Sequence, residues 1–439
     1  GRVVDQLTCK SRFLEIEAAG SREELKASAA FNLHALAEEL DQFLDLRDVE
    51  LAGDGWSHLN WKQDEQGDFR VDGDLQIRNL RLNRPDHRPW NEDNLVMLLE
   101  ATGRIEDSRL AQLEEAQLKI DGGEERLNRD ELVAWLLKPI SAIEADTRYP
   151  IGLKARGQLA RWLARLEPWT GDLIAGDVDG SFVTSAQGAF STQAGQFDQI
   201  ETEVRGLVGR MGPVQWDEPE LTASGSGRWD RRERELSLDR LALRSETINV
   251  DGRQVEARLP AEGTPSLRGD LSFSGELNRL LDWLRDPEAE RSTTRTHGKV
   301  SGKAQIARNG QLTTTDVTAR IDDLVVESPD QDPYREREVR LAARGAYDAD
   351  QDRLKLDTLD VTSGALAVKA SGQINELAER RLCDLSGNVE YDASEIARML
   401  ENYLGRGLSA TGRESQAFVL RGPLAEAEIV ARRGVNSED

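Results

Sequence analysis

The stretch GELNRLLDWLRDP, from Gly275 to Pro287, places apolar side chains at Leu277, Leu280, Leu281 and Leu284. The spacing i, i+3, i+4, i+7 puts all four on one side of an α-helix, so the stretch predicts a short amphipathic helix. The segments around it instead alternate apolar and polar residues with a period of two, which is typical of β-strands. This region is therefore predicted to be β-sheet interrupted by one helix.

The same helical spacing recurs at three other places in the chain. The matching side chains are Leu33, Leu36, Ala37 and Leu40; Leu159, Trp162, Leu163 and Leu166; and Ile396, Met399, Leu400 and Tyr403. Successive starts are 126, 118 and 119 residues apart. Each helix directly follows an alternating segment, so a strand is expected to run straight into it. Four such junctions at nearly constant spacing indicate an internal repeat, and we expect each helical stripe to pack against the sheet.

A second marker of the repeat lies between the helices, where the segment from Leu221 aligns with the segment from Val339. At a constant offset of 118 residues, Leu236, Leu238, Leu241 and Leu243 match Leu354, Leu356, Leu359 and Val361. The alternation places each set on one face of a strand, with polar side chains opposite. These eight residues are the candidates for a shared apolar trough.

The repeat predicts four units, at residues 1–145, 146–265, 266–384 and 385–439, the last of them truncated. The longer first unit is explained by an extra helix near residues 128–138, where NRDELVAWLLKP carries Leu132, Val133 and Leu136 on a helical stripe and ends at Pro139. Polar turns such as WDRRERE and YDADQD favour antiparallel meanders. The predicted fold is mainly β: an elongated, curved antiparallel sheet array with one short amphipathic helix per repeat.

The composition limits the class of partner. With 57 basic and 81 acidic residues the formal charge is −24, which argues against nucleic acid and against a broad basic contact with anionic membranes. No apolar run is long enough to span a bilayer, and no signal peptide is visible. The chain starts at Gly1 within an alternating segment, so we expect it to be part of a longer protein. The two cysteines, Cys9 and Cys383, are expected to be unpaired thiols.

No pattern of catalytic or metal-binding residues emerges. The four histidines are scattered without ligand spacing, and no nucleophile or phosphate-binding motif occurs. Asp348, Asp350 and Asp352 open like a calcium loop, but Arg353 and Leu359 stand where that loop needs Gly and Glu. We therefore expect a solvated hairpin turn there, and a protein that is neither an enzyme nor dependent on a metal or cofactor.

The strand–helix junctions GELNRLLDWL and DASEIARML, with the strands HGKVSGKAQIARNG (from His297) and AGDVDGSFVTSAQG (from Ala175), resemble the AsmA-like family, including its TamB and YhdP branches. The resemblance covers most of the chain, through degenerate motifs. It implies a repeating β-groove that holds or conducts phospholipid between the inner and outer membranes of a diderm cell envelope, or supports outer-membrane assembly. It also implies a periplasmic location, an inner-membrane anchor outside this chain, phospholipid acyl chains as partners and other envelope proteins as possible partners.

A second function class fits the same alternation. A structural β-repeat, such as a spacer or an adhesin-like stalk, would fill its interior with the same Leu, Val and Ile side chains. The two classes differ in whether the apolar positions line an open trough or interdigitate in a dry core.

Overall fold

The computed structural model describes residues 4–21, 23–41, 49–85, 87–123, 129–144, 146–170, 178–211, 214–258, 264–283, 295–327, 333–377, 381–394, 412–423 and 428–432. The chain divides into two compact units, Gly1–Arg228 and Trp229–Asp439. The repeat boundaries predicted from the sequence fall elsewhere and remain a prediction.

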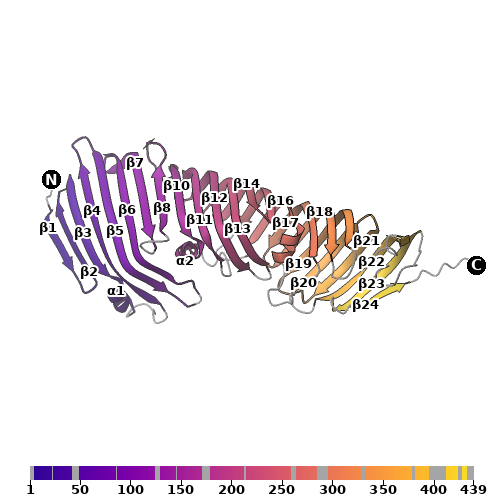
Figure 1. Cartoon of the computed structure of the whole chain (residues 1–439). Helices are drawn as coiled ribbons and strands as arrows, with labels where there is room; N and C mark the ends of the chain where they lie inside the picture. Colours follow the sequence, from indigo (N-terminus) through magenta and orange to yellow (C-terminus); the bar gives the residue numbers. More distant parts are fainter. Residues whose placement is uncertain are drawn as a thin grey trace, which may run out of the picture. The chain divides into compact units, whose positions relative to one another are not determined.

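The first unit is an antiparallel sheet whose strands curve along their length (Figure 1). Its strands are β1 (Val4–Lys10), β2 (Leu14–Gly20), β3 (Glu24–Asn32), β4 (Glu50–Gln63), β5 (Asp68–Asn83), β6 (Trp90–Glu106), β7 (Arg109–Gly122), β8 (Asp130–Leu136), β9 (Ile140–Ser141), β10 (Tyr149–Gln158), β11 (Val178–Phe190), β12 (Ala194–Met211) and β13 (Val214–Asp230), whose last two residues belong to the second unit. From β1 to β8, consecutive strands pair with one another. Strand β10 pairs with the other edge of β8, and the short β9 pairs with β7.

The second unit is also an antiparallel meander. Its strands are β14 (Glu235–Ser245), β15 (Ile248–Arg258), β16 (Ser266–Glu276), β17 (Arg295–Asn309), β18 (Leu312–Glu327), β19 (Tyr334–Asp348), β20 (Arg353–Thr362), β21 (Leu366–Asn375), β22 (Leu382–Asp392), β23 (Arg413–Pro423) and β24 (Glu428–Arg432). Each pairs with the next in chain order. The predicted mainly β, antiparallel fold is confirmed.

The predicted strand-to-helix junctions are present. Helices α1 (Leu33–Leu40), α2 (Leu159–Thr170) and α3 (Leu277–Trp283) begin at the residue after β3, β10 and β16 respectively. At the first junction Asn32 caps the helix, because its side-chain oxygen accepts a hydrogen bond of 2.6 Å from the Ala35 amide. In chain order six strands of more than two residues separate α1 from α2, and six separate α2 from α3.

The fourth junction is only partly described. Ala393 and Ser394, directly after β22, are helical. The predicted stripe Ile396, Met399 and Leu400 lies outside the described residues, as does Leu284 at the end of the third stripe. None of the described helices is both long and apolar enough to cross a bilayer.

The extra helix predicted near residues 128–138 is wrong, because Asp130–Leu136 form strand β8. The segment LVAWLL satisfies both periods: Leu132, Val133 and Leu136 fit a helix, while Leu132, Ala134 and Leu136 alternate. Pairing with β7 on one side and β10 on the other decides in favour of the strand. Pro139 then interrupts the ladder, which resumes at β9.

Candidate functional site

The cross-strand register brings the eight predicted trough residues onto one face of the second unit. Residues directly opposite on paired strands point to the same side of a sheet. One row of such partners runs Leu241, Gly252, Leu271, Ala304, Val317, Ala343, Leu359. A second runs Leu243, Val250, Phe273, Gly302, Ala319, Leu341, Val361. Leu241 and Leu243 therefore stand at one end of these two rows, and Leu359 and Val361, 118 residues later, stand at the other end. The surface that carries the rows is here called the apolar face.

The other two pairs of predicted residues end two further rows. Leu236 leads through Ala257, Leu267, Arg308, Thr313 and Tyr347 to Leu354. Leu238 pairs with Val255, and a bulge at Gln254–Val255 sets Val255 beside Gly269, where a Cβ atom on the glycine would lie 3.0 Å from Val255 Cγ2. The row continues through Ile306, Thr315 and Gly345 to Leu356.

The side chains of the apolar face are largely half-buried. All eight predicted residues are of intermediate exposure. Leu267, on the same face, is 39% exposed, and Leu59 and Leu99, on the corresponding face of the first unit, are 39% and 42% exposed. Close-packed cores bury such side chains fully. Within the described residues this face is therefore only partly covered, although Ala304 in the row from Leu241 is buried.

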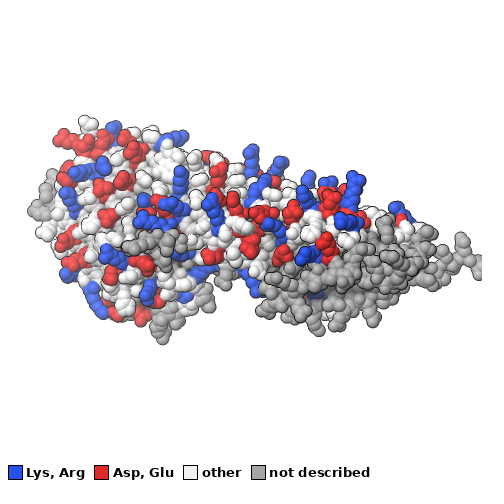
Figure 2. Space-filling view, in the orientation of Figure 1, with Lys and Arg blue, Asp and Glu red and all other residues white. Residues whose placement is uncertain are grey.

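The opposite face is polar. One of its rows runs Ala242, Asp251, Ser272, Lys303, Thr318, Ala342, Asp360, Lys369. Basic and acidic side chains are interspersed over the surface seen in Figure 2. Many of them pair across strands, as Arg421 of β23 does with Asp384 of β22 at 3.1 Å. Such exposed pairs neutralise one another locally.

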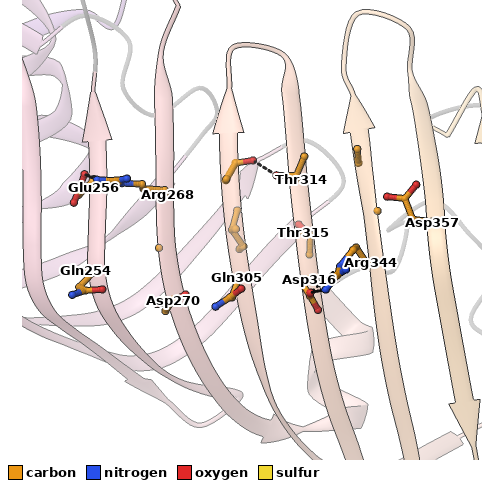
Figure 3. A pocket seen from close by; sticks show the side chains of 15 residues that line it. Gln254, Glu256, Arg268, Asp270, Gln305, Thr314, Thr315, Asp316, Arg344 and Asp357 are labelled. Atoms are coloured by element: carbon orange, nitrogen blue, oxygen red, sulfur yellow. Dashed lines mark hydrogen bonds and ion pairs between the residues drawn. The ribbon is translucent and has the colours of Figure 1, made fainter.

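A hollow of about 710 Å³ lies on the polar face of the second unit (Figure 3). Arg268 and Arg344 reach into it, but each is already paired with a carboxylate, Glu256 at 2.8 Å and Asp316 at 2.9 Å. Thr314 donates to the backbone oxygen of Ala307. The hollow is lined mainly by such paired polar groups, so it offers no apolar wall for an acyl chain.

Helix α3 contacts the apolar face, and helix α2 contacts the face of the first unit that carries Leu59 and Leu99. A Cβ atom on Gly275 would lie 3.4 Å from Leu280 Cδ1 of α3, and Trp162 of α2 packs edge-on against Phe182 of β11 at 6.0 Å between ring centroids. The other stripe residues Leu33, Leu36, Leu40, Leu159, Leu163 and Leu277 are half-buried. Leu166 and Leu281 are 47% and 41% exposed, so the packed stripe is narrower than predicted.

The most buried side chains of α2 are different from those predicted. Ala164, Arg165 and Glu167 are 5%, 8% and 6% exposed. Beneath the helix, Arg165 Nε donates to Glu92 Oε1 of β6 at 2.6 Å, and Arg165 Nη2 lies 2.8 Å from Asp130 Oδ2 of β8. Ion pairs, and not only apolar contacts, therefore hold α2 against strands β6 and β8.

Further hydrogen bonds complete this cluster, which we call the ionic seat: Glu92, Asp130, Arg161 and Arg165. Arg161 Nε lies 2.7 Å from Asp130 Oδ2, and the amide of Gln158 donates to Asp130 Oδ1 at 2.9 Å. Glu92 accepts from the Trp90 ring nitrogen at 3.0 Å and from the Gly123 amide at 2.8 Å. Two carboxylates face two guanidinium groups, so the buried charges balance.

Two glycines make room for the ionic seat. A Cβ atom on Gly122 would lie 2.7 Å from Arg165 Nη2, and one on Gly157 would lie 2.1 Å from Asp130 Oδ1. Gly122 pairs with Asp130 across the sheet. The seat therefore occupies positions of the apolar face where neighbouring strands carry no side chain.

The C-terminal half of α2 is held by the loop before β6. Glu167 Oε1 lies 2.8 Å from the His87 ring, and its second oxygen accepts from the Arg88 amide at 3.0 Å. Burial alone would raise the pKa of Glu167, but these hydrogen bonds outweigh it and lower the pKa below its ordinary value.

Sequence reasoning missed the ionic seat. Its members come from β6, β8 and α2, so no local spacing connects them. One signal was available: Asp130 interrupts an otherwise apolar alternation with Leu132, Ala134 and Leu136. A carboxylate at such a position needs a buried cation or several donors.

The remaining sequence candidates have structural explanations. Asp348 accepts hydrogen bonds from the amides of Asp350 and Gln351, and Tyr347 donates its hydroxyl to Asp352 at 3.1 Å, so this segment is a hairpin turn, as predicted. Cys9 and Cys383 are both free thiols. Among the described residues no three His, Cys, Asp or Glu side chains come together as a metal site.

Comparison of the sequence with models of known protein families and with characterised proteins finds no match.

Proposed function

We propose that this chain is a lipid-holding protein of the cell envelope, and that the apolar face takes up phospholipid acyl chains. The observation that supports it most is the row continuity of the second unit: the rows that join the Leu236–Leu243 set to the Leu354–Val361 set carry mainly apolar residues, and all eight end residues are of intermediate exposure. The apolar surface that these leucines leave in water costs about 25 cal/mol per Å², and an acyl chain laid on them would remove that cost.

The chemistry of the two faces favours an alkyl ligand over a polar one. The apolar face offers methyl and methylene groups along four rows, and its polar members are few. The polar face carries paired charges and would stay in water while the ligand is held on the other side. Because the sheet is curved and unclosed, a flexible chain could enter from the side without threading through a pore.

The resemblance to AsmA-like proteins agrees with this proposal and gives it a setting. Under it, the chain would carry phospholipid between inner and outer membranes or support outer-membrane assembly, with its parent protein anchored in the inner membrane. No catalytic step is assigned to it.

The test is a solvent extract of the protein purified from a bacterial envelope fraction, analysed by mass spectrometry. We expect co-purifying phospholipid in stoichiometric or higher amounts. A protein that carries none, and takes up none from mixed micelles of phosphatidylethanolamine, would be a structural spacer instead, because its apolar face would then have to be covered by protein.

A further inference from the structure

One charged residue lies within the apolar rows of the second unit. In the row from Leu236 to Leu354, Arg308 of β17 stands between Leu267 of β16 and Thr313 of β18. Among the described residues of the four rows it is the one cation. It lies two residues before the tip of the β17–β18 hairpin, at the end of β17 away from α3.

The guanidinium of Arg308 is oriented but not neutralised by the described residues. Its Nε donates to the backbone oxygen of Gly310 at 2.8 Å, which fixes the plane of the group. The neighbouring arginines of the polar face differ, because Arg268 is paired with Glu256 and Arg344 with Asp316. The described contacts of Arg308 therefore leave its two terminal nitrogens available, and a fork of two such donors matches the oxygens of a phosphate.

A second donor stands directly beside Arg308. Thr313 is its register partner, so the two Cβ atoms are about 5 Å apart and both side chains can reach one phosphate group. Tyr347, the next residue in the row, has its hydroxyl committed to Asp352. The pair Arg308 and Thr313 thus supplies a cation and a hydroxyl on an otherwise apolar surface.

Apolar side chains begin immediately next to this pair. Ile306 and Ala304 precede Arg308 on the same face of β17, and Leu267 beside Arg308 is 39% exposed. A ligand bound through an anionic group at Arg308 would lay a hydrocarbon tail over Ile306 and onward along the strand. Such a ligand is amphiphilic, with a phosphate at one end.

We propose that Arg308 and Thr313 bind the phosphate of an anionic phospholipid headgroup at the rim of the apolar face, and so set which way the lipid lies on it. The inference rests on the proposed function and adds the headgroup site to it. Because Arg308 is exposed, its charge is solvated when the site is empty.

The experiment compares delipidated protein binding phosphatidylglycerol and diacylglycerol with the same acyl chains, by native mass spectrometry. The variants are Arg308→Gln, Arg308→Lys and, as a matched control, Lys303→Gln on the polar face of the same strand. We expect Arg308→Gln to weaken phosphatidylglycerol binding on the order of tenfold and to leave diacylglycerol binding unchanged. Arg308→Lys should keep part of the preference, since it keeps the charge and loses the fork, and Lys303→Gln should match the parent.

Circular dichroism of each variant checks that the sheet is intact. If Arg308→Gln folds and keeps the parent's preference for phosphatidylglycerol, the headgroup site is wrong while the lipid-holding function stands. If the parent binds neither lipid, the proposed function fails and the site falls with it. Inorganic phosphate serves as a competitor. If it displaces phosphatidylglycerol at equal concentration, Arg308 and Thr313 bind free phosphate and the lipid assignment is overturned.

Discussion

Arg165 on α2 and Glu92 on β6 are 73 residues apart in sequence, yet their side chains meet at 2.6 Å with the glutamate fully buried. The contact fixes a helix to the apolar face of a sheet through charge. Removing one partner of such a pair leaves the other desolvated, which costs far more than the pair itself contributes.

The first prediction is that Arg165→Met destabilises the first unit by about 3–5 kcal/mol, because Glu92 and Asp130 would then share only one arginine. Urea unfolding gives the free energy, and hydrogen exchange of residues 159–167 shows whether α2 detaches first.

Arg205→Met is the matched control. Arg205 also pairs with a carboxylate, Glu203, but is 73% exposed on β12, so its loss should change the free energy of unfolding by less than about 0.5 kcal/mol. If the two variants are equally stable, the ionic seat does not hold α2.

The second prediction concerns acid. The folded-state pKa of Glu167 is lowered, so its interactions with His87 and Arg88 stabilise the protein above the ordinary value of 4.5 and are lost as pH falls through the folded pKa. Glu167→Gln should be about 1–2 kcal/mol less stable than the parent at pH 7.

Unfolding of parent and variant is then compared at successively lower pH. The stability difference should persist down to about pH 4.5 and shrink below it. A difference that stays constant into strong acid would mean that the carboxylate charge of Glu167 contributes nothing.

The start of every described helix was predictable, because the change of period happens within a few residues. At Leu33, Leu159 and Leu277 the alternation of a strand gives way directly to a helical stripe. The shared face of the two leucine sets was also predictable, since the 118-residue offset spans six strands and the rows connect equivalent positions.

What failed depended on contacts distant in sequence. Residues 130–136 carry apolar side chains that fit both periods, and only pairing with β7 and β10 selects the strand. Arg165 looked like a polar position of an amphipathic helix, yet it is more buried than Leu166 because Glu92 and Asp130 lie beneath it. The sequence pattern of a helix does not show which charged residues of the sheet the helix will contact.

The third prediction concerns Tyr334 at the start of β19. Burial, with the Glu336 carboxylate beside it, raises its pKa to about 12. The raised value stabilises the folded state at pH below the ordinary value of 10, and this stabilisation is lost as pH rises through about 12. Glu336→Gln should lower the Tyr334 pKa while leaving it above the ordinary value, because burial is the larger cause.

Ultraviolet titration of phenolate absorbance measures this, with Tyr334→Phe identifying the Tyr334 contribution. If Glu336→Gln leaves the late-titrating component unchanged, burial alone accounts for the shift. If the component titrates near pH 10 in the parent protein, Tyr334 is in contact with water and the account of its surroundings is wrong.

The last prediction separates a lipid-holding face from a dry core at Leu356. Leu356 is half-buried in a row with Gly345 and Gly372, neither of which adds a side chain over it. A carboxylate introduced there by Leu356→Glu can reach water, so the variant should fold with a loss below about 2 kcal/mol. In a filled core the same unpaired charge would cost several kcal/mol and unfold the unit.

Lys355→Glu, one residue away on the polar face, is the control for adding a carboxylate to β20. It changes the net charge by −2, against −1 for Leu356→Glu, and loses only an exposed pair with Asp357, so it is the stricter control. Both variants should unfold near the parent's midpoint in urea, but only Leu356→Glu should lose bound phospholipid, because a charge among acyl chains must be desolvated. Two results would remove Leu356 from the lipid-holding face. One is an unfolded Leu356→Glu beside a folded Lys355→Glu, which would show a packed interior. The other is a folded Leu356→Glu that retains as much lipid as the parent, which would place the acyl chains elsewhere.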